Sequence, residues 1–255
     1  MSLEDFYYLF LAVWALTATG TFIGLFFKVA PYGRYLDSVT SVTSVTLPSR
    51  IGWILMESPT VVGIFIFLLM FQKSIGYVEI CLSSIWLLHY IHRTFMWPFR
   101  AKLENKRMTL TVILMALLFN IVNITIQCLW IFILGEYVDE WLFSSFFLIG
   151  LSLFLIGMLI NIKSDNILMN LRTNHGEGYH VPNGFLYRYI TCPNYLGELI
   201  EWFGWFVLTM SPAALTFFVW TFANLVPRAK SNHEWSKLNI KNYPSNRKAI
   251  FPFVY

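Results

Sequence analysis

Charged residues are scarce in this chain of 255 residues: only 13% are Asp, Glu, Lys or Arg, whereas 57% are hydrophobic. A soluble domain of this length needs about a quarter of its residues charged to cover its surface. The shortage excludes an ordinary soluble domain and predicts that lipid forms part of the solvent. The net charge of +4 is modest, and we expect no nucleic-acid partner.

Cysteines and nucleotide-binding motifs are also scarce. Cys81, Cys128 and Cys192 show no paired spacing, which excludes a disulfide framework and a cysteine-based zinc motif. Gly176-Glu177-Gly178 follows no strand pattern, and the chain has neither G-x-G-x-x-G nor a P-loop. Any nucleotide would therefore bind without a Rossmann fold.

Long apolar runs, by contrast, are abundant. Each is near the roughly 20 residues that a bilayer requires. The stretch 196–226 would be about 45 Å long as a single helix, too long for one crossing, and Ser211-Pro212 lies near its middle, where proline ends or kinks a helix. The sequence predicts an all-α integral membrane protein, one domain over 1–255, with seven transmembrane helices at about 6–28, 52–71, 75–97, 109–134, 141–162, 195–209 and 212–226.

Basic residues determine the expected orientation. With seven crossings, the loops 29–51, 98–108 and 163–194 and the tail 227–255 share one side and hold most of the Lys and Arg. The positive-inside rule places that side in the cytosol and the N-terminus outside or in the lumen. Six crossings would put the basic tail outside. Glu4 and Asp5 stand where a signal peptide has basic residues, so the first run is interpreted as a retained helix.

Glu57 lies inside the second apolar run, next to Pro59. An ionisable group at membrane depth costs at least about 2.5 kcal/mol, which makes it a functional candidate. Pro59 frees backbone groups that must face protein or a wet cavity. Two interpretations follow, a polar pocket residue or a buried carboxylate paired with Arg93.

The third apolar run contains His89-Tyr90-Ile91-His92-Arg93-Thr94. His89 and His92 lie one turn apart, as do Tyr90 and Arg93. Two histidines and a carboxylate suit iron or zinc, but five histidines in the whole chain are too few for the paired motifs of membrane di-iron oxygenases. We predict no metal site.

Polar residues also gather in the predicted cytosolic segments and at the start of the sixth helix. Arg favours bidentate phosphate binding, which suggests a pocket for an anionic cofactor. Positive-inside charge and contact with membrane lipid headgroups are the alternative explanation. Glu198 and Glu201 could interact with a polar ligand or an internal Arg, or simply with the helix dipole.

These pieces, in this order, resemble the steroid 5-alpha-reductase family over nearly the whole chain. The likeness is carried by Pro31–Gly33, Leu47–Arg50 leading to Glu57, His89–Thr94, Asn161–Asp165, Pro193–Trp202, Tyr243-Pro244, Arg247–Ala249 and Pro252-Phe253. The resemblance implies a seven-helix membrane reductase that uses NADPH to saturate a carbon–carbon double bond conjugated to a carbonyl.

The resemblance also implies site residues. Glu57 and Tyr90 would lie at the substrate carbonyl, where one positioned donor to the developing enolate can contribute about 3–4 kcal/mol. Tyr90 would donate and Glu57 would orient it, in the protonated form that apolar burial favours. The α-carbon would take its proton from water. The cofactor would contact Tyr32, Asn161, Asp165, Arg172, Tyr179, Asn194, Glu198, Glu201 and Arg228, supported by Trp202, Tyr243 and Arg247.

Two departures from the family pattern lie in the tail. Ser236 stands where relatives carry Tyr, and Asn232 stands beside a single histidine where relatives can carry several. These changes put one cofactor contact in doubt. Residues 98–108 match poorly, and only Arg107 is carried over from them.

Several substrates and two other classes of protein stay open. The Glu57/Tyr90 pair near Leu47-Pro48 and the compact length favour a 3-oxo-Δ4 steroid, and we expect a monomer. Another enone lipid, a long-chain enoyl thioester or a polyprenol would also suit the family. An S-adenosylmethionine-dependent membrane methyltransferase resembles the chain at Pro193–Gly197 and in the tail. A sterol sensor or transporter is the non-enzymatic alternative.

Overall fold

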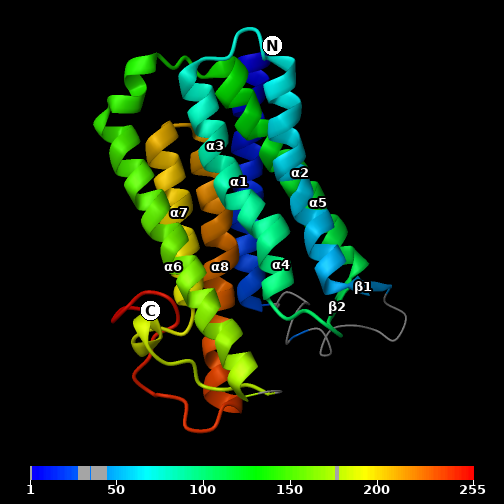
Figure 1. Ribbon diagram of the computed structural model, residues 1–255, viewed down its shortest axis with the longest axis vertical. Helices are drawn as coiled ribbons and strands as arrows, with labels where there is room; N and C mark the ends of the chain where they lie inside the picture. Colours follow the sequence, from blue (N-terminus) through cyan, green and yellow to red (C-terminus); the bar gives the residue numbers. More distant parts are fainter. Residues whose placement is uncertain (1, 28–34, 36–44, 176–177) are drawn as a thin grey trace. The chain divides into compact units, whose positions relative to one another are not determined.

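The computed structural model describes residues 2–27, 35, 45–175 and 178–255, and most of them are helical (Figure 1). Tyr32 lies outside the described residues. The chain divides into two compact units, a first unit of residues 1–8 and 30–144 and a second unit of residues 9–29 and 145–255. Helix α1, Leu3–Phe27, begins in the first unit and continues in the second.

The first unit is built around three long helices, which are expected near 52–71, 75–97 and 109–134. They are α2 (Ser49–Met70), α3 (Tyr77–Ile91), which continues into a π-helical turn at His92–Met96 and α4 (Trp97–Arg100), and α5 (Leu110–Leu129), which ends in a second π-helical turn at Trp130–Leu134. A 3-10 helix follows at Asp139–Phe143.

A short sheet precedes α2 and α5. Strand β1, Thr46–Pro48, pairs antiparallel with β2, Arg107–Thr109, with Leu47 opposite Met108. The Arg107 guanidinium reinforces this pairing by donating to the Thr46 hydroxyl and carbonyl, both at 2.7 Å. These two strands were not predicted, because a three-residue pairing leaves no periodicity to detect, and the fold still fits the expected all-α class.

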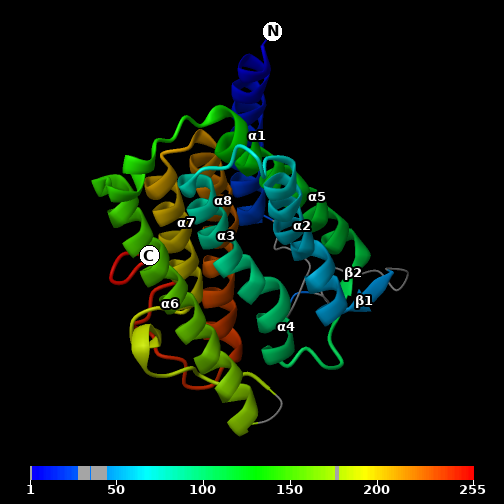
Figure 2. The same ribbon diagram turned by 45° about the horizontal axis from the view of Figure 1, so that its top comes forward.

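The second unit contains α6 (Ser145–His175), a 3-10 turn at Phe185–Arg188, α7 (Pro193–Thr209) and α8 (Pro212–Asn239), which run side by side in both views (Figures 1 and 2). Between α7 and α8, Met210 adopts a left-handed conformation, and the Ser211 hydroxyl caps α8 by accepting from the Ala214 amide at 3.2 Å. The expected break at Ser211-Pro212 is thus a two-residue turn.

Two helices run further than expected. Helix α6 continues past residue 162 to His175, and α8 continues through Pro227 to Asn239. Hydropathy indicates where a helix would leave the hydrocarbon core of a membrane. The helix itself can continue into water, because its backbone hydrogen bonds are satisfied internally. Parts of the expected loops 163–194 and 227–255 are therefore helical.

Glycines hold α6 against α7. A Cβ added at Gly150, Gly157, Gly197 or Gly204 would come within 2.3–2.5 Å of backbone nitrogen on the facing helix. Two glycines on each helix, seven residues apart, let the backbones approach as small residues do in membrane helix pairs. This close approach brings the polar residues near the end of α6 beside the start of α7.

Four of the described helices are long and apolar enough to cross a membrane: Leu3–Phe27, Ser49–Met70, Leu110–Leu134 and Ser145–Asn174. Large apolar side chains on them are exposed, including Leu16, Leu69, Leu118 and Leu159. Exposed apolar faces of this kind need lipid contact. The helical fold fits a membrane protein, although only four helices meet these criteria.

Candidate active site

Glu57 lies in α2, eight residues after its first residue, Ser49, in a segment that Pro59 weakens. Pro59 has no N–H, so the Leu55 carbonyl loses its normal helical donor. The Ser58 hydroxyl donates to that carbonyl at 3.1 Å, and the Thr60 hydroxyl donates to the Glu57 carbonyl at 2.5 Å. Side chains thus repair the helix around the proline.

Asn120 of α5 contacts the same turn of α2. It is 6% exposed, and its Nδ2 donates to the Met56 carbonyl at 2.6 Å and to Glu57 Oε2 at 3.2 Å. Three successive carbonyls before Pro59, those of residues 55, 56 and 57, therefore accept side-chain hydrogen bonds. The contact also fixes one oxygen of the Glu57 carboxyl.

Tyr90 lies in the last turns of α3 and is 3% exposed. Its ring stacks at a tilt against Trp86, with centroids 4.7 Å apart, and meets His89 edge to face at 4.9 Å. Trp86 Nε1 donates to the Thr60 carbonyl at 3.0 Å. The rings that hold Tyr90 are thus anchored to the turn of α2 that carries Glu57.

Arg93 lies in the π-helical turn after Tyr90. Its guanidinium stacks over Trp53 at 4.6 Å and over Trp97 at 4.9 Å, and Trp53 Nε1 donates to the Arg93 carbonyl at 3.2 Å. Such cation–π contacts stabilise a partly buried cation. Single-turn π-helices are frequent at functional sites, and this one begins two residues after Tyr90.

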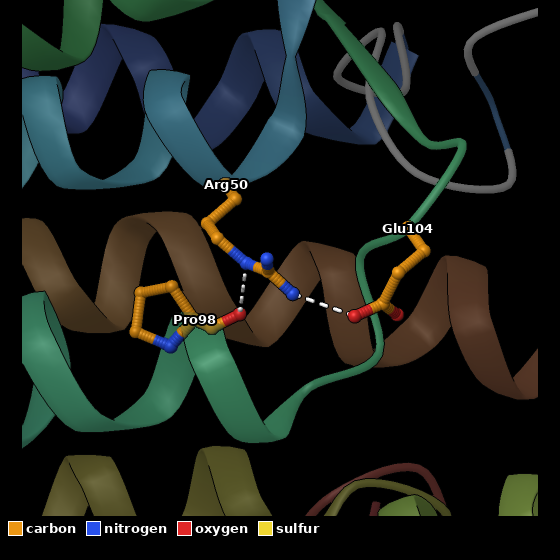
Figure 3. Close-up of polar contacts among 3 residues, drawn as sticks. All are labelled: Arg50, Pro98 and Glu104. Carbon is orange, nitrogen blue, oxygen red and sulfur yellow. Dashed lines mark hydrogen bonds and ion pairs between the residues drawn. The ribbon is translucent and has the colours of Figure 1, made fainter.

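The start of α2 is tied to the 98–108 segment by Arg50. Its Nε donates to the Pro98 carbonyl at 3.3 Å, and its Nη2 forms a 2.6 Å ion pair with Glu104 Oε1 (Figure 3). A backbone hydrogen bond within Glu104 and the bond from Arg50 lower the pKa of the Glu104 carboxyl. Because Glu104 is exposed, this pair fixes geometry more than it stabilises the fold.

In the second unit, Asn161 and Asp165 of α6 meet Asn194 at the start of α7. Asn161 Nδ2 donates to the Asn194 carbonyl at 3.0 Å, and Asn194 Nδ2 donates to Asp165 Oδ1 at 3.1 Å. Both α6 residues are buried. Three residues expected at the cofactor are therefore brought together, next to the Gly157–Gly197 approach.

The other expected cofactor residues are more dispersed. Glu201 is fully buried, and Trp202 packs edge to face on Phe217 at 4.5 Å, so both lie in the interior of the second unit. Glu198 and Arg228 are half-buried and Arg172 is exposed. Tyr179 is also exposed and meets Trp235 of α8 at 4.5 Å.

The C-terminal tail pairs with the segment that leads into α7. Lys248 N donates to the Tyr189 carbonyl at 2.9 Å, and Thr191 N donates to the Lys248 carbonyl at 2.8 Å. Beneath it, the Tyr187 hydroxyl donates to the Ser164 carbonyl at 3.3 Å, and burial raises the pKa of Tyr187 well above its usual value. The tail is thereby fixed beside Pro193 and Asn194.

Thr191 joins this tail to α8. Its Oγ1 lies 2.6 Å from His233 Nδ1, 2.7 Å from the Tyr243 hydroxyl and 3.2 Å from the Lys248 carbonyl. A hydroxyl has one proton and two lone pairs. All three contacts are satisfied when Thr191 donates to Lys248 and accepts from His233 and Tyr243. Burial, and secondarily Lys237, lower the pKa of His233.

Arg247, in the same tail, is 4% exposed. Its Nη2 donates to Asn183 Oδ1 at 3.1 Å, and its guanidinium lies 5.3 Å from the Tyr243 ring centre. Its Nε and Nη1 have no hydrogen-bond partner among the described residues. A buried cation with unused donors is costly unless an anion pairs with it, so this arrangement suits a phosphate-bearing ligand.

A cavity of about 460 Å³ lies beside the end of α6. It is lined by Ile167, Asn170, Leu171, Asn174, His180, Val181 and Asn183. Asn183 connects it to Arg247, but none of the expected cofactor residues lines it. Helical spacing puts its α6 residues on a different face from Asn161 and Asp165.

Some residues of these networks were not predicted from the sequence. Asn120, Asn183 and Thr191 hydrogen-bond to expected site residues, and the His233 ring meets that of Tyr243 edge to face, with centroids 6.1 Å apart. Asn120 had a detectable signal, because a polar amide in the apolar run 109–134 needs a partner. Thr191 had none, since an isolated threonine in a polar loop is unremarkable until the tail pairs with it.

The chain was compared with known proteins. Residues 106–255 match the family described as 3-oxo-5-alpha-steroid 4-dehydrogenase. The chain is 41% identical to the steroid 5-alpha-reductase DET2 of Solanum lycopersicum, over 92% of this chain and 91% of that protein. It is 38% identical to DET2 of Arabidopsis thaliana (92% and 91%) and 32% identical to 3-oxo-5-alpha-steroid 4-dehydrogenase 1 of Rattus norvegicus (91% and 89%).

Proposed function

Since the chain belongs to the 3-oxo-5-alpha-steroid 4-dehydrogenase family, a family of oxidoreductases, we propose that it reduces the Δ4 double bond of 3-oxo-Δ4 steroids with NADPH. The product is the 5α-3-oxosteroid. The observation that carries the proposal is the connected set of contacts that holds half-buried Glu57 and buried Tyr90 in one apolar helical unit.

Carbonyl polarisation is assigned to Glu57 and Tyr90. Addition at the β-carbon of an enone builds negative charge on the distant carbonyl oxygen. A donor already in place stabilises that charge without reorganisation and can contribute about 3–4 kcal/mol. Tyr90 donates a hydrogen bond from its hydroxyl to the carbonyl. Glu57 orients the Tyr90 hydroxyl or shares that hydrogen bond, and water supplies the proton to the α-carbon.

Cofactor binding is assigned to the second unit. The unused donors of buried Arg247 fit a phosphate, and the Asn161–Asn194–Asp165 network offers amide and carboxylate groups for polar parts of a nucleotide. Bound NADPH supplies the hydride for the β-carbon. Arg172, Tyr179, Glu198, Glu201, Trp202, Arg228 and Tyr243 complete the proposed contacts, together with Tyr32, which lies outside the described residues.

Seven crossings are part of the proposal. Beyond the four long apolar helices, the α3 segment with its π-helical continuation, α7 and the first half of α8 supply three more. The C-terminal tail is then cytosolic and the N-terminus is outside or luminal, in a bacterial inner membrane or the endoplasmic reticulum. We propose that the protein acts as a monomer.

The test is NADPH oxidation by the detergent-purified protein with a 3-oxo-Δ4 steroid and with the same steroid lacking the 3-oxo group. The proposal predicts oxidation, and a product two hydrogens heavier, with the ketone alone. Turnover only with an enoyl thioester, a polyprenol or another enone lipid would change the assigned substrate and leave the assignment as an NADPH-dependent reductase unchanged. If NADPH neither binds nor is consumed and S-adenosylmethionine binds, the methyltransferase replaces the reductase.

A further inference from the structure

Asn120 of α5 makes a direct hydrogen bond to the Glu57 carboxyl. One amide nitrogen donates to two oxygens, Met56 O and Glu57 Oε2. This pattern also fixes the orientation of the Asn120 amide. In the flipped orientation Oδ1 would replace Nδ2 and would face two hydrogen-bond acceptors. We propose that Asn120 is a positioning residue that orients Glu57 for the reductase reaction, an inference that rests on the proposed function.

The chemistry of the contact determines which carboxyl oxygen can act. An amide N–H only donates, so Glu57 Oε2 must accept. When Glu57 is protonated, its proton therefore resides on the other oxygen, Oε1, from which it can be donated to a substrate carbonyl. Asn120 thus distinguishes the two carboxyl oxygens of Glu57.

The backbone contact adds a second constraint. Pro59 removes the helical bond to Leu55, and the Glu57 turn is then held by Ser58, Thr60 and Asn120. Of these, only Asn120 comes from another helix, and only Asn120 touches the Glu57 carboxyl. It thus fixes both the backbone turn and the side chain that projects from it.

A merely structural role for Asn120 is the competing explanation, and a double-mutant cycle separates the two. Asn120→Leu keeps the volume and removes both bonds. We expect kcat to fall about tenfold, the loss typical of a hydrogen bond to a carboxyl group, with KM nearly unchanged. In a Glu57→Gln background the same substitution should change kcat by less than about twofold, because the group it positions is gone.

Asn123 provides the matched control. It lies one turn further along α5, is 1% exposed and accepts from Gln127 at 3.5 Å. Asn123→Leu therefore removes a buried amide of the same helix without touching Glu57. Its effect on kcat, whatever its size, should be the same in the wild-type and Glu57→Gln backgrounds.

A donor–acceptor exchange keeps the proposal testable if Asn120→Leu fails to fold. Asn120→Asp places an acceptor against an acceptor and should lower the thermal midpoint. The double variant Asn120→Asp with Glu57→Gln restores a donor–acceptor pair at the carboxyl position and should recover part of that loss, since the bond to the Met56 carbonyl stays absent. Equal kcat losses for Asn120→Leu in both backgrounds, or no recovery in the exchange, would overturn the proposal. An inactive wild-type protein would instead refute the reductase assignment. The thermal midpoints of the donor–acceptor exchange variants do not depend on that assignment.

Discussion

The two units place their polar residues in opposite ways. In the first unit, a few polar groups lie among apolar helices, half-buried Glu57 and buried Asn120 and Tyr90, and Trp86 and Thr60 connect them. In the second, polar residues are numerous, and glycine contacts and a paired tail decide which of them meet. A polar residue in an apolar helix can therefore be recognised from the sequence as a candidate site residue. A polar residue in a polar segment can be recognised only from its contacts in the folded protein.

The proposed function places carbonyl chemistry in the first unit and cofactor binding in the second. Substitutions in the first should change turnover and leave NADPH affinity intact. Substitutions in the second should change NADPH affinity or the packing that supports it.

The largest effect is expected from Gly157→Leu. A Cβ there would lie 2.3 Å from the Glu201 backbone nitrogen, so α6 and α7 must separate, at about 3 kcal/mol or more of folding free energy. The thermal midpoint in detergent should fall sharply, and NADPH binding with it. Gly24→Leu in α1 is the matched control, since a Cβ at Gly24 meets nothing within 4 Å; equal losses in both variants would refute the packing argument.

Arg247→Gln should weaken NADPH binding by roughly 2 kcal/mol, about thirtyfold in Kd, because charge-assisted hydrogen bonds to a phosphate are lost. The Kd can be measured by calorimetry on the purified protein. Arg188→Gln removes an exposed arginine from the same unit and should change Kd by less than about twofold. An unchanged Kd in Arg247→Gln would mean that the buried guanidinium serves the fold alone.

Thr191→Val should lower stability by about 1 kcal/mol, since His233, Tyr243 and Lys248 lose one shared hydroxyl. Denaturation in mixed micelles would measure it. Thr173→Val is the control, because the exposed Thr173 hydroxyl bonds only within its own helix, to Met169. A Thr191 variant as stable as this control would show that the tail does not depend on Thr191.

The smallest effect concerns pH. Burial and Lys237 lower the pKa of His233 from its ordinary 6.5, so the unfolded chain binds more protons than the folded protein between the two values. The stability contributed by His233 is present above pH 6.5 and is lost as pH falls through the folded-state pKa. In His233→Gln, the thermal midpoint should change less between pH 7 and pH 5 than it does in the wild type. An identical pH dependence in the variant would exclude His233 as its source.

The sequence predicted much of the first unit because lipid leaves a strong signal. The apolar runs located α2, α5 and α3 with its π-helical continuation to within a few residues, and the energetic cost of a carboxylate at membrane depth singled out Glu57. The family inferred from scattered motifs is confirmed by the relatives. The predicted roles of the site residues stay predictions.

What the sequence could not supply is set by contacts between distant segments. The 31 residues of α6 extend past the apolar run because a helix does not end where lipid would. The meeting of Asn161 with Asn194 depends on four glycines that look ordinary in a helix pattern. Thr191 acquires its partners only when α8 and the tail bring His233, Tyr243 and Lys248 to it.

The central claim is tested most directly by measuring kcat and NADPH Kd together for Tyr90→Phe, with a 3-oxo-Δ4 steroid as substrate. The account predicts that kcat falls about a hundredfold, as when a donor to a developing oxyanion is removed, while Kd for NADPH stays within about twofold. A kcat within about threefold of wild type would contradict it, because the carbonyl would then be polarised without Tyr90.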